Sequence, residues 1–426
     1  MELFDAYIEA MAFSLIVILS YLFSYISAKT KVPSILLLIG LGVGAQALIV
    51  KYEVDLTLYI KEVINLLGIV GLIIIILEAT LELKIKKEKK GLLIWSFIMA
   101  FLSLLLTTSG IASLLYFFII QDVVKALFYA IPLAIISSEI VIPGVSGLLS
   151  QKKEYLIYES AFSGIIGIMF FYILLGSMSQ DGATRIVLGI SGNIVATLII
   201  SLVISYALVW MLQWLKLNIK LFFLIAILVF LYALGEMLHL SALLIILVFG
   251  LILNNYTIFF RGRLRGLIKK DLLENITEDF RLVTNETSFL VKTFYFFIFG
   301  MTLNFKNIYN LNVIYIVAGS LIVIYFIRYI LLKSIERKQI TPQVWIAPRG
   351  FISVLLFFSI PALWSDPAFD STILLIILLA TSLVMFTGLV SKKEEIHQAD
   401  ELSFEDWDQL DREIKALTID EKDLRK

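Results

Sequence analysis

Six charged side chains stand inside long apolar stretches, and their chemistry needs an explanation. They are Glu78, Glu139, Glu159, Lys292, Arg328 and Arg349. A charge at the centre of a lipid bilayer costs at least about 2.5 kcal/mol, so such a residue usually serves transport or pairs with an opposite charge. The three carboxylates could bind a cation or a proton, and the three basic groups could balance their charge.

Glu139 and Glu78 are the candidate ion- or proton-binding carboxylates. Glu139 lies in AIISSEIVIPGV, four residues before Pro143, where a loosened helix would offer carbonyl oxygens to a dehydrated cation. The alternative is a structural ion pair between Glu139 and a basic residue such as Arg349. Glu78 follows the long apolar run LLGIVGLIIIIL, which places it deep in the same kind of environment.

The remaining charges favour structural or charge-compensating roles. Glu159 and Arg328 could pair with each other, which would fix geometry more than it would add stability. Lys292 could extend its alkyl stem so that the ammonium reaches the cytoplasmic surface, and we favour this arrangement over a buried one. Arg349 could orient a broken helix or offset charge in an empty site.

The elements that must position these residues are membrane-spanning helices. The chain is 60% hydrophobic and only 16% charged, and apolar runs of about 20 residues recur along it. Without cysteine it can form neither disulfides nor thiolate metal sites. Enzyme signatures, a basic nucleic-acid-binding domain and a cofactor or metal motif are also missing from the sequence.

Thirteen spans account for the apolar pattern and for the charges of the loops. We expect them at 7–28, 33–50, 60–80, 93–119, 124–149, 155–177, 186–214, 220–235, 240–255, 283–304, 312–332, 342–361 and 370–390. Basic residues concentrate in alternate loops, so the positive-inside rule predicts an external amino terminus and a cytoplasmic carboxyl terminus. The first stretch follows an acidic start and favours a retained helix over a cleaved signal.

Two spans carry a proline and a glycine that should break the helix. These are Pro143 and Gly144 in the fifth span, and Pro348 and Gly350 in the twelfth. By the expected topology the two spans run in opposite directions. A matched pair of interrupted helices indicates an inverted repeat with its binding site at the breaks, although two incidental kinks are the alternative.

The sequence divides into two regions. Residues 1–390 form the transmembrane domain, and residues 391–426 form an acidic cytoplasmic tail. Within the tail, apolar residues recur at helical spacing from Phe404 to Leu417. They predict either a short surface helix or a helix that docks on the transporter domain or on a partner protein.

Several motifs together resemble the monovalent cation/proton antiporter superfamily, and its sodium/proton exchanger branch more than its potassium-efflux branch. They occur in the family's order as NLLGIVGLIIIILEATLEL, SSEIVIPG, YESAFSGIIGIMFF, FYFFIFGMTL, FIRYILL and APRGFISV. The Pro-Arg-Gly motif is the most specific of them. The resemblance implies an all-α inverted-repeat fold with a core and a dimerisation domain, elevator-like motion of the core, and a homodimer.

The chain departs from the family at the Asn-Asp motif, where it has Ser163 and Gly164. The resemblance implies ligand roles for Glu78, Ser138, Ser160 and Ser163. Glu139 would supply the missing charge from the neighbouring helix.

We therefore expect a secondary transporter that exchanges a monovalent cation for protons. Sodium is favoured, with lithium or potassium as alternatives, and a bacterial inner membrane is the expected location. A transport-inactive sensor or scaffold that works with a partner protein remains open because of the altered motif. An ion channel or a carrier for another solute is a further alternative.

Overall fold

The protein is built from α-helices, and the described residues contain no strand. The computed structural model describes residues 2–30, 34–51, 57–85, 89–148, 150–177, 183–212, 221–237, 242–260, 266, 268–303, 311–335, 340–366 and 369–390. Long runs of Leu, Ile, Val and Phe form helices here because a helix satisfies its own backbone groups where no water is available. The acidic tail, 391–426, lies outside the described residues.

The helices have the following bounds. They are α1 Glu2–Thr30, α2 Ser34–Lys51, α3 Thr57–Glu82, α4 Lys90–Phe118, α5 Val123–Ala134, α6 Ser138–Gly144, α7 Ser150–Ser177, α8 Ala183–Leu212, α9 Leu221–Met237, α10 Ala242–Asn254, α11 Tyr256–Phe259, α12 Lys270–Thr302, α13 Leu311–Ile335, α14 Phe351–Phe358 and α15 Ser371–Val390, with short 3-10 turns at Val145–Gly147, Gln343–Trp345 and Ala362–Trp364. Six segments within the described residues are long and apolar enough to cross a membrane. The count of thirteen spans remains a prediction.

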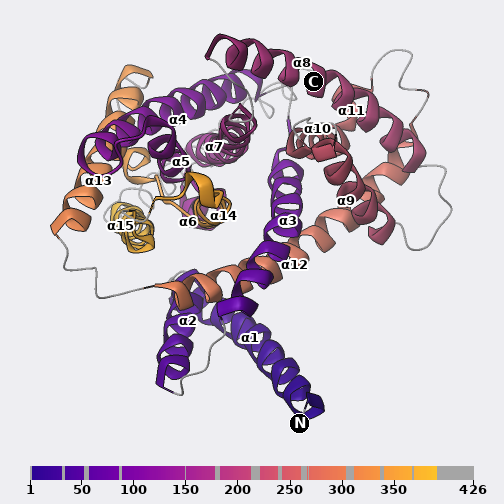
Figure 1. Ribbon diagram of the computed structural model, residues 1–426. Helices are drawn as coiled ribbons and strands as arrows, with labels where there is room; N and C mark the ends of the chain where they lie inside the picture. Colours follow the sequence, from indigo (N-terminus) through magenta and orange to yellow (C-terminus); the bar gives the residue numbers. More distant parts are fainter. Residues whose placement is uncertain are drawn as a thin grey trace, which may run out of the picture.

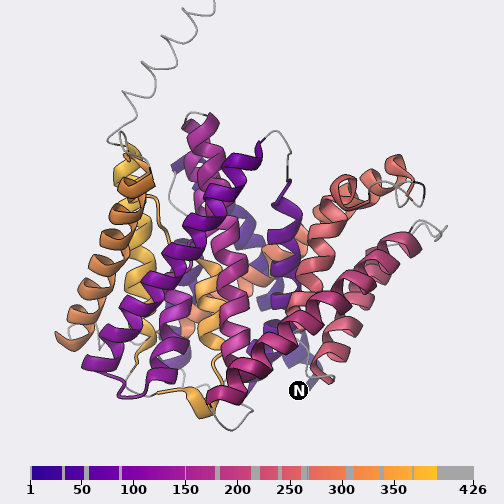
Figure 2. The same cartoon turned by 90° about the horizontal axis from the view of Figure 1, so that it is seen from above.

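The helices form two groups that lie side by side (Figure 1). The inner bundle comprises α4 to α7 and α13 to α15, and Figure 2 shows these helices running along a common direction. The outer group comprises α1 to α3 and α8 to α12. Helix α3 lies between α12 and the inner bundle, and α12 also contacts α14 of the bundle (Figure 1).

Helix α12 is held by close packing against α2 and α1. Gly42 and Gly300 let the α2 and α12 backbones touch, since a Cβ added to Gly300 would lie 2.2 Å from the carbonyl oxygen of Ile39. Ser20 of α1 shares a buried 2.6 Å hydrogen bond with Thr293 of α12. These contacts fix the part of α12 that carries Lys292.

Helix α3 is anchored at its carboxyl end by Asn254, the last residue of α10, and by Asn255, which follows it. The Asn254 amide donates to the carbonyl of Thr80 at 3.2 Å, and the Asn255 amide donates to that of Leu83 at 2.9 Å. The side-chain oxygen of Asn255 also accepts from the backbone N–H of Ile85 at 2.7 Å. The end of α3 therefore has partners for backbone groups that the helix leaves free.

Two extended segments meet inside the inner bundle. One is residues 135–137, between α5 and α6, and the other is residues 346–350, immediately before α14. The backbone N–H of Ser137 donates to the carbonyl of Pro348 at 2.9 Å. Each segment thus supplies a hydrogen-bond partner that a continuous helix would have provided.

The expected break at Pro143 and Gly144 was misplaced. Both residues belong to α6, and the chain is interrupted before that helix. The β-branched Ile135 and Ile136 and the serine that follows favour extended backbone over helix. Pro143 instead removes one donor from α6, which ends one residue later. Pro348 and Gly350, in contrast, lie in the second extended segment itself.

Candidate functional site

The ammonium of Lys292 on α12 lies between two carboxylates. Its Nζ is 2.9 and 2.7 Å from the two oxygens of Glu78 on α3, and 3.0 Å from Oε1 of Glu139 on α6. Ser288, one turn before the lysine, also donates to Glu78. The side chains of the triad are only 14–20% exposed. The structure therefore brings together the two carboxylates that the sequence singled out.

The Glu78–Lys292–Glu139 triad joins the two helix groups. Glu78 and Lys292 belong to the outer group, and Glu139 belongs to the inner bundle directly after its first extended segment. With all three groups ionised the triad carries one net negative charge. We expected the ammonium of Lys292 to extend to the cytoplasmic surface. Instead it is largely buried and paired with both carboxylates.

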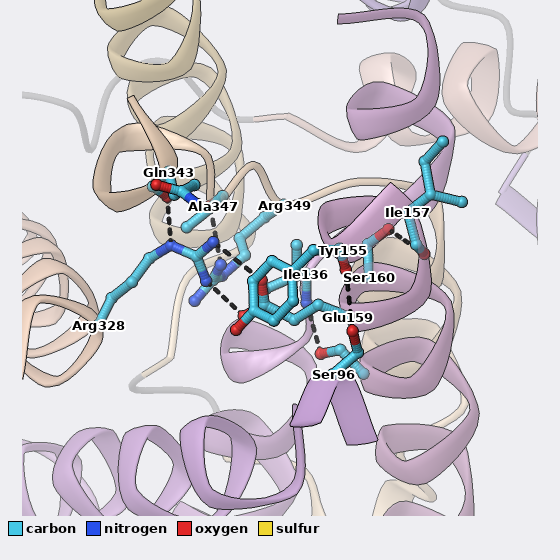
Figure 3. Close-up of polar contacts among 11 residues, drawn as sticks. Ser96, Ile136, Tyr155, Ile157, Glu159, Ser160, Arg328, Gln343, Ala347 and Arg349 are labelled. Atoms are coloured by element: carbon cyan, nitrogen blue, oxygen red, sulfur yellow. Dashed lines mark hydrogen bonds and ion pairs between the residues drawn. The ribbon is translucent and has the colours of Figure 1, made fainter. Parts of the chain in front are cut away.

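Glu159 and Arg328 form the expected pair within the inner bundle (Figure 3). Arg328 donates to the two carboxylate oxygens at 2.7 and 3.1 Å, and its Nε donates to the carbonyl of Gln343 at 2.9 Å. Each of the two side chains is 1% exposed. Such a two-pronged buried pair fixes the positions of α7 and α13 relative to each other.

Arg349 binds backbone carbonyls, and its hydrogen bonds do not involve Glu139. Its Nε donates to the carbonyl of Leu133 at 2.6 Å. Its Nη1 donates to the carbonyl of Ala347 at 2.8 Å (Figure 3). Leu133 lies near the end of α5, just before the first extended segment, and Ala347 lies in the second. The ion pair of Glu139 is made with Lys292, and Arg349 instead stabilises the interrupted backbone.

The three candidate serines have different surroundings. Ser163 accepts a 3.0 Å hydrogen bond from the backbone N–H of Ile136, in the first extended segment. Ser160 donates to the carbonyl of Ile157 in its own helix at 3.0 Å. Ser138 is buried at the start of α6, next to Glu139. Ser163 thus supports the backbone that leads to Glu139, whereas the Ser160 hydroxyl bonds within its own helix, α7.

The comparisons with known proteins place the chain in a family. The family described as sodium/hydrogen exchanger, transmembrane, matches residues 14–392. The chain belongs to the transmembrane sodium/hydrogen exchanger family. It is therefore an integral membrane protein of a transporter family, not of an enzyme family.

The fold of this exchanger-family protein is also that of a solved antiporter. It is similar to the sodium proton antiporter MjNhaP1 from Methanocaldococcus jannaschii, with a TM-score of 0.65, 17% sequence identity, and coverage of 95% of this chain and 99% of that one. No curated relative matches the sequence. The resemblance inferred from the motifs is confirmed at the level of family and fold.

Sequence reasoning missed several residues around the exchanger's site. Ser288 precedes Lys292 by four residues in a predicted span, so helical spacing could have indicated that both face one partner. Thr381 accepts from the backbone N–H of Arg349 at 3.1 Å, and no pattern in α15 indicated this. Asn254 and Asn255 were also missed, because their anchoring of α3 depends on contacts between distant segments.

Proposed function

We propose that the protein exchanges one monovalent cation for one proton across the membrane, and that Glu139 is the carboxylate on which they compete. The observation that carries this proposal is the position of Glu139. Its carboxylate lies 3.0 Å from the ammonium of Lys292, and it is the second residue of α6, just after the extended segment 135–137. The site needs one positive charge to become neutral. A proton and a monovalent cation meet that need equally, so a one-for-one exchange would be electroneutral.

The neighbouring oxygen atoms suit a hard cation. Glu139 and Glu78 would supply carboxylate oxygens, and Ser138, the residue before Glu139, would add its hydroxyl or its carbonyl. Alkali cations are bound by such oxygen ligands. We propose sodium as the transported ion, in line with the family description, with lithium and potassium as the alternatives. The roles of Ser160 and Ser163 in the ion's shell are proposals of the same kind.

The groups around the interrupted backbone keep the site in shape. Arg349 holds the carbonyl of Leu133 near the end of α5 and that of Ala347 in the second extended segment, and Ser163 holds an N–H of the first segment. The Glu159–Arg328 pair fixes the helices behind them. We propose that Arg349 and the Glu159–Arg328 pair position Glu139 without binding the ion themselves, so that charge on the triad alone changes during a cycle.

The test is proton flux in liposomes that contain the purified protein and an internal pH-sensitive dye. Sodium, lithium and potassium chloride are added in turn, and choline chloride controls for osmotic and ionic-strength effects. Cation-dependent alkalinisation or acidification would establish exchange and identify the ion. Folded protein that responds to none of the three would contradict the proposal and favour the transport-inactive sensor, which neither the family match nor the fold supports.

We also propose an arrangement for the protein in its membrane. The amino terminus would be external, the carboxyl terminus cytoplasmic, the membrane a bacterial inner membrane, and the assembly a homodimer. The absence of cysteine makes this testable without background, since single cysteines can be placed in alternate loops and labelled from either side. Labelling on the wrong side would overturn the orientation, and a monomeric mass in mild detergent and in lipid would overturn the dimer.

The tail at 391–426 is proposed as a separate cytoplasmic region that docks on the transporter domain or on a partner protein. Its composition differs from that of 1–390. Removing it should leave exchange intact while changing its regulation or a partner's binding. Loss of folding on removal would show instead that the tail belongs to the transporter domain.

A further inference from the structure

Every ammonium hydrogen of Lys292 has a carboxylate oxygen to bind. The three short distances are those to both oxygens of Glu78 and to one oxygen of Glu139. An ammonium has three donors and no acceptor, so this set uses its full capacity. The lysine also comes from the outer group, whereas Glu139 comes from the inner bundle.

The same oxygen atoms are those that an incoming cation would use. A monovalent cation between Glu78 and Glu139 and the ammonium of Lys292 would compete for one position and for one set of lone pairs. The two arrangements differ in charge, because the resident ammonium leaves the pair of carboxylates with one negative charge to neutralise, not two. Glu82 also lies within electrostatic range of all three groups, and Arg281 acts on Glu82 with the opposite charge.

We propose that Lys292 is an internal counter-cation, which the transported cation displaces from Glu139 and in part from Glu78. It thereby sets both the affinity for the cation and the number of charges that the site exchanges. This inference rests on the proposed function. It adds that Lys292 sets how tightly the cation binds, beyond balancing charge.

Substitutions that change the charge count in a controlled way test the inference. K292M leaves two carboxylates without their resident cation, and we expect the sodium concentration for half-maximal exchange at pH 8.5 to fall about tenfold. E78Q leaves Lys292 to neutralise Glu139 completely, and we expect that concentration to rise at least about tenfold. The double variant E78Q/K292M restores one net negative charge and should bring it back to within about threefold of the wild-type value.

A second readout does not depend on transport. The thermal unfolding temperature of each purified variant is measured in sodium chloride and in choline chloride at equal ionic strength. A ligand that binds only the folded state raises this temperature, so the sodium-dependent shift should follow the same order as the affinities. K125M is the matched control. Lys125 belongs to a different ion pair, in which its Nζ lies 3.6 Å from Oδ2 of Asp366. We expect it to leave both readouts as in the wild type.

The outcomes separate the inference from the proposed function. No exchange by the wild-type protein with any of the three cations would sink the proposed function. Exchange by the wild type, with E78Q/K292M folded and no better than E78Q, would overturn the role of Lys292 alone. K292M with an unchanged or raised half-maximal concentration would overturn it as well. Should the methionine variants fail to fold, E78Q/K292Q provides the same charge count with a hydrogen-bonding amide.

Discussion

Arg349 Nε lies 2.6 Å from the carbonyl oxygen of Leu133, so the guanidinium of one extended segment caps the helix that leads into the other. Its Nη1 meanwhile binds the carbonyl of Ala347, two residues earlier in its own segment. The side chain is fully buried. A single residue thus satisfies backbone acceptors on both sides of the meeting point.

Lysine cannot replace this arginine, because an ammonium is a point charge and lacks the planar fork that reaches both carbonyls. We expect R349K to lower the free energy of unfolding by about 2 kcal/mol, and R349Q by at least as much. Thermal unfolding in detergent measures both. An R349K protein as stable as the wild type would contradict this role.

Gly350 is required where the two extended segments approach each other. A Cβ at this position would lie 2.1 Å from Oγ and 2.6 Å from Cβ of Ser137. We expect G350A to cost about 2 kcal/mol of stability, and S137G/G350A to recover most of it by removing the clashing atoms. The control is G147A, since a Cβ on Gly147 would meet no atom within 4 Å. Equal unfolding temperatures for G350A and G147A would refute the close approach.

The buried Glu159–Arg328 pair should respond very differently from an ion pair at the surface. E159Q leaves the Arg328 charge buried without its partner, and we expect a loss of about 3–5 kcal/mol. Glu154 pairs with Lys89 where both side chains are about 30% exposed, so E154Q should cost less than about 1 kcal/mol. Denaturation of both variants by the same method measures the difference. Comparable losses would show that burial does not govern these pairs.

Ser163 supports the backbone beside Glu139, and this makes a prediction about stability. S163A leaves the buried N–H of Ile136 without its acceptor, and we expect a cost of about 1–3 kcal/mol. The Ser160 hydroxyl bonds within its own helix, so S160A should cost less. The comparison uses thermal unfolding of both variants. A larger loss in S160A than in S163A would reverse the assignment.

The sequence was sufficient for features that depend on composition and order. Apolar runs predicted the helical membrane fold, and the motifs predicted the family. Helix α12 shows the limit, because it begins at Lys270 although a span was predicted only from residue 283. Its first half is amphipathic, with charged residues on one face, so a search for apolar runs passes over it.

The site could be predicted only in its separate members. Glu78, Glu139 and Lys292 lie on three helices that are far apart in the sequence, and nothing in their spacing indicates that one ammonium binds both acids. Charge balance suggested Arg349 as the partner of Glu139. Arg349 instead donates to backbone carbonyls, because the breaks in the helices leave carbonyls without a helical partner. The position of the first break was mistaken for a related reason, since proline was given more weight than the Ile-Ile-Ser run.

The central claim is that Glu139 carries the exchange, and E139Q tests it most directly. Cation-dependent proton flux is measured in liposomes for the wild type, for E139Q, and for E154Q as a glutamate outside the site. We expect E139Q to fold and to lose flux at every pH, because an amide neither binds a proton nor supplies a charged ligand, while E154Q retains it. Folded E139Q with wild-type, pH-dependent exchange would contradict the account.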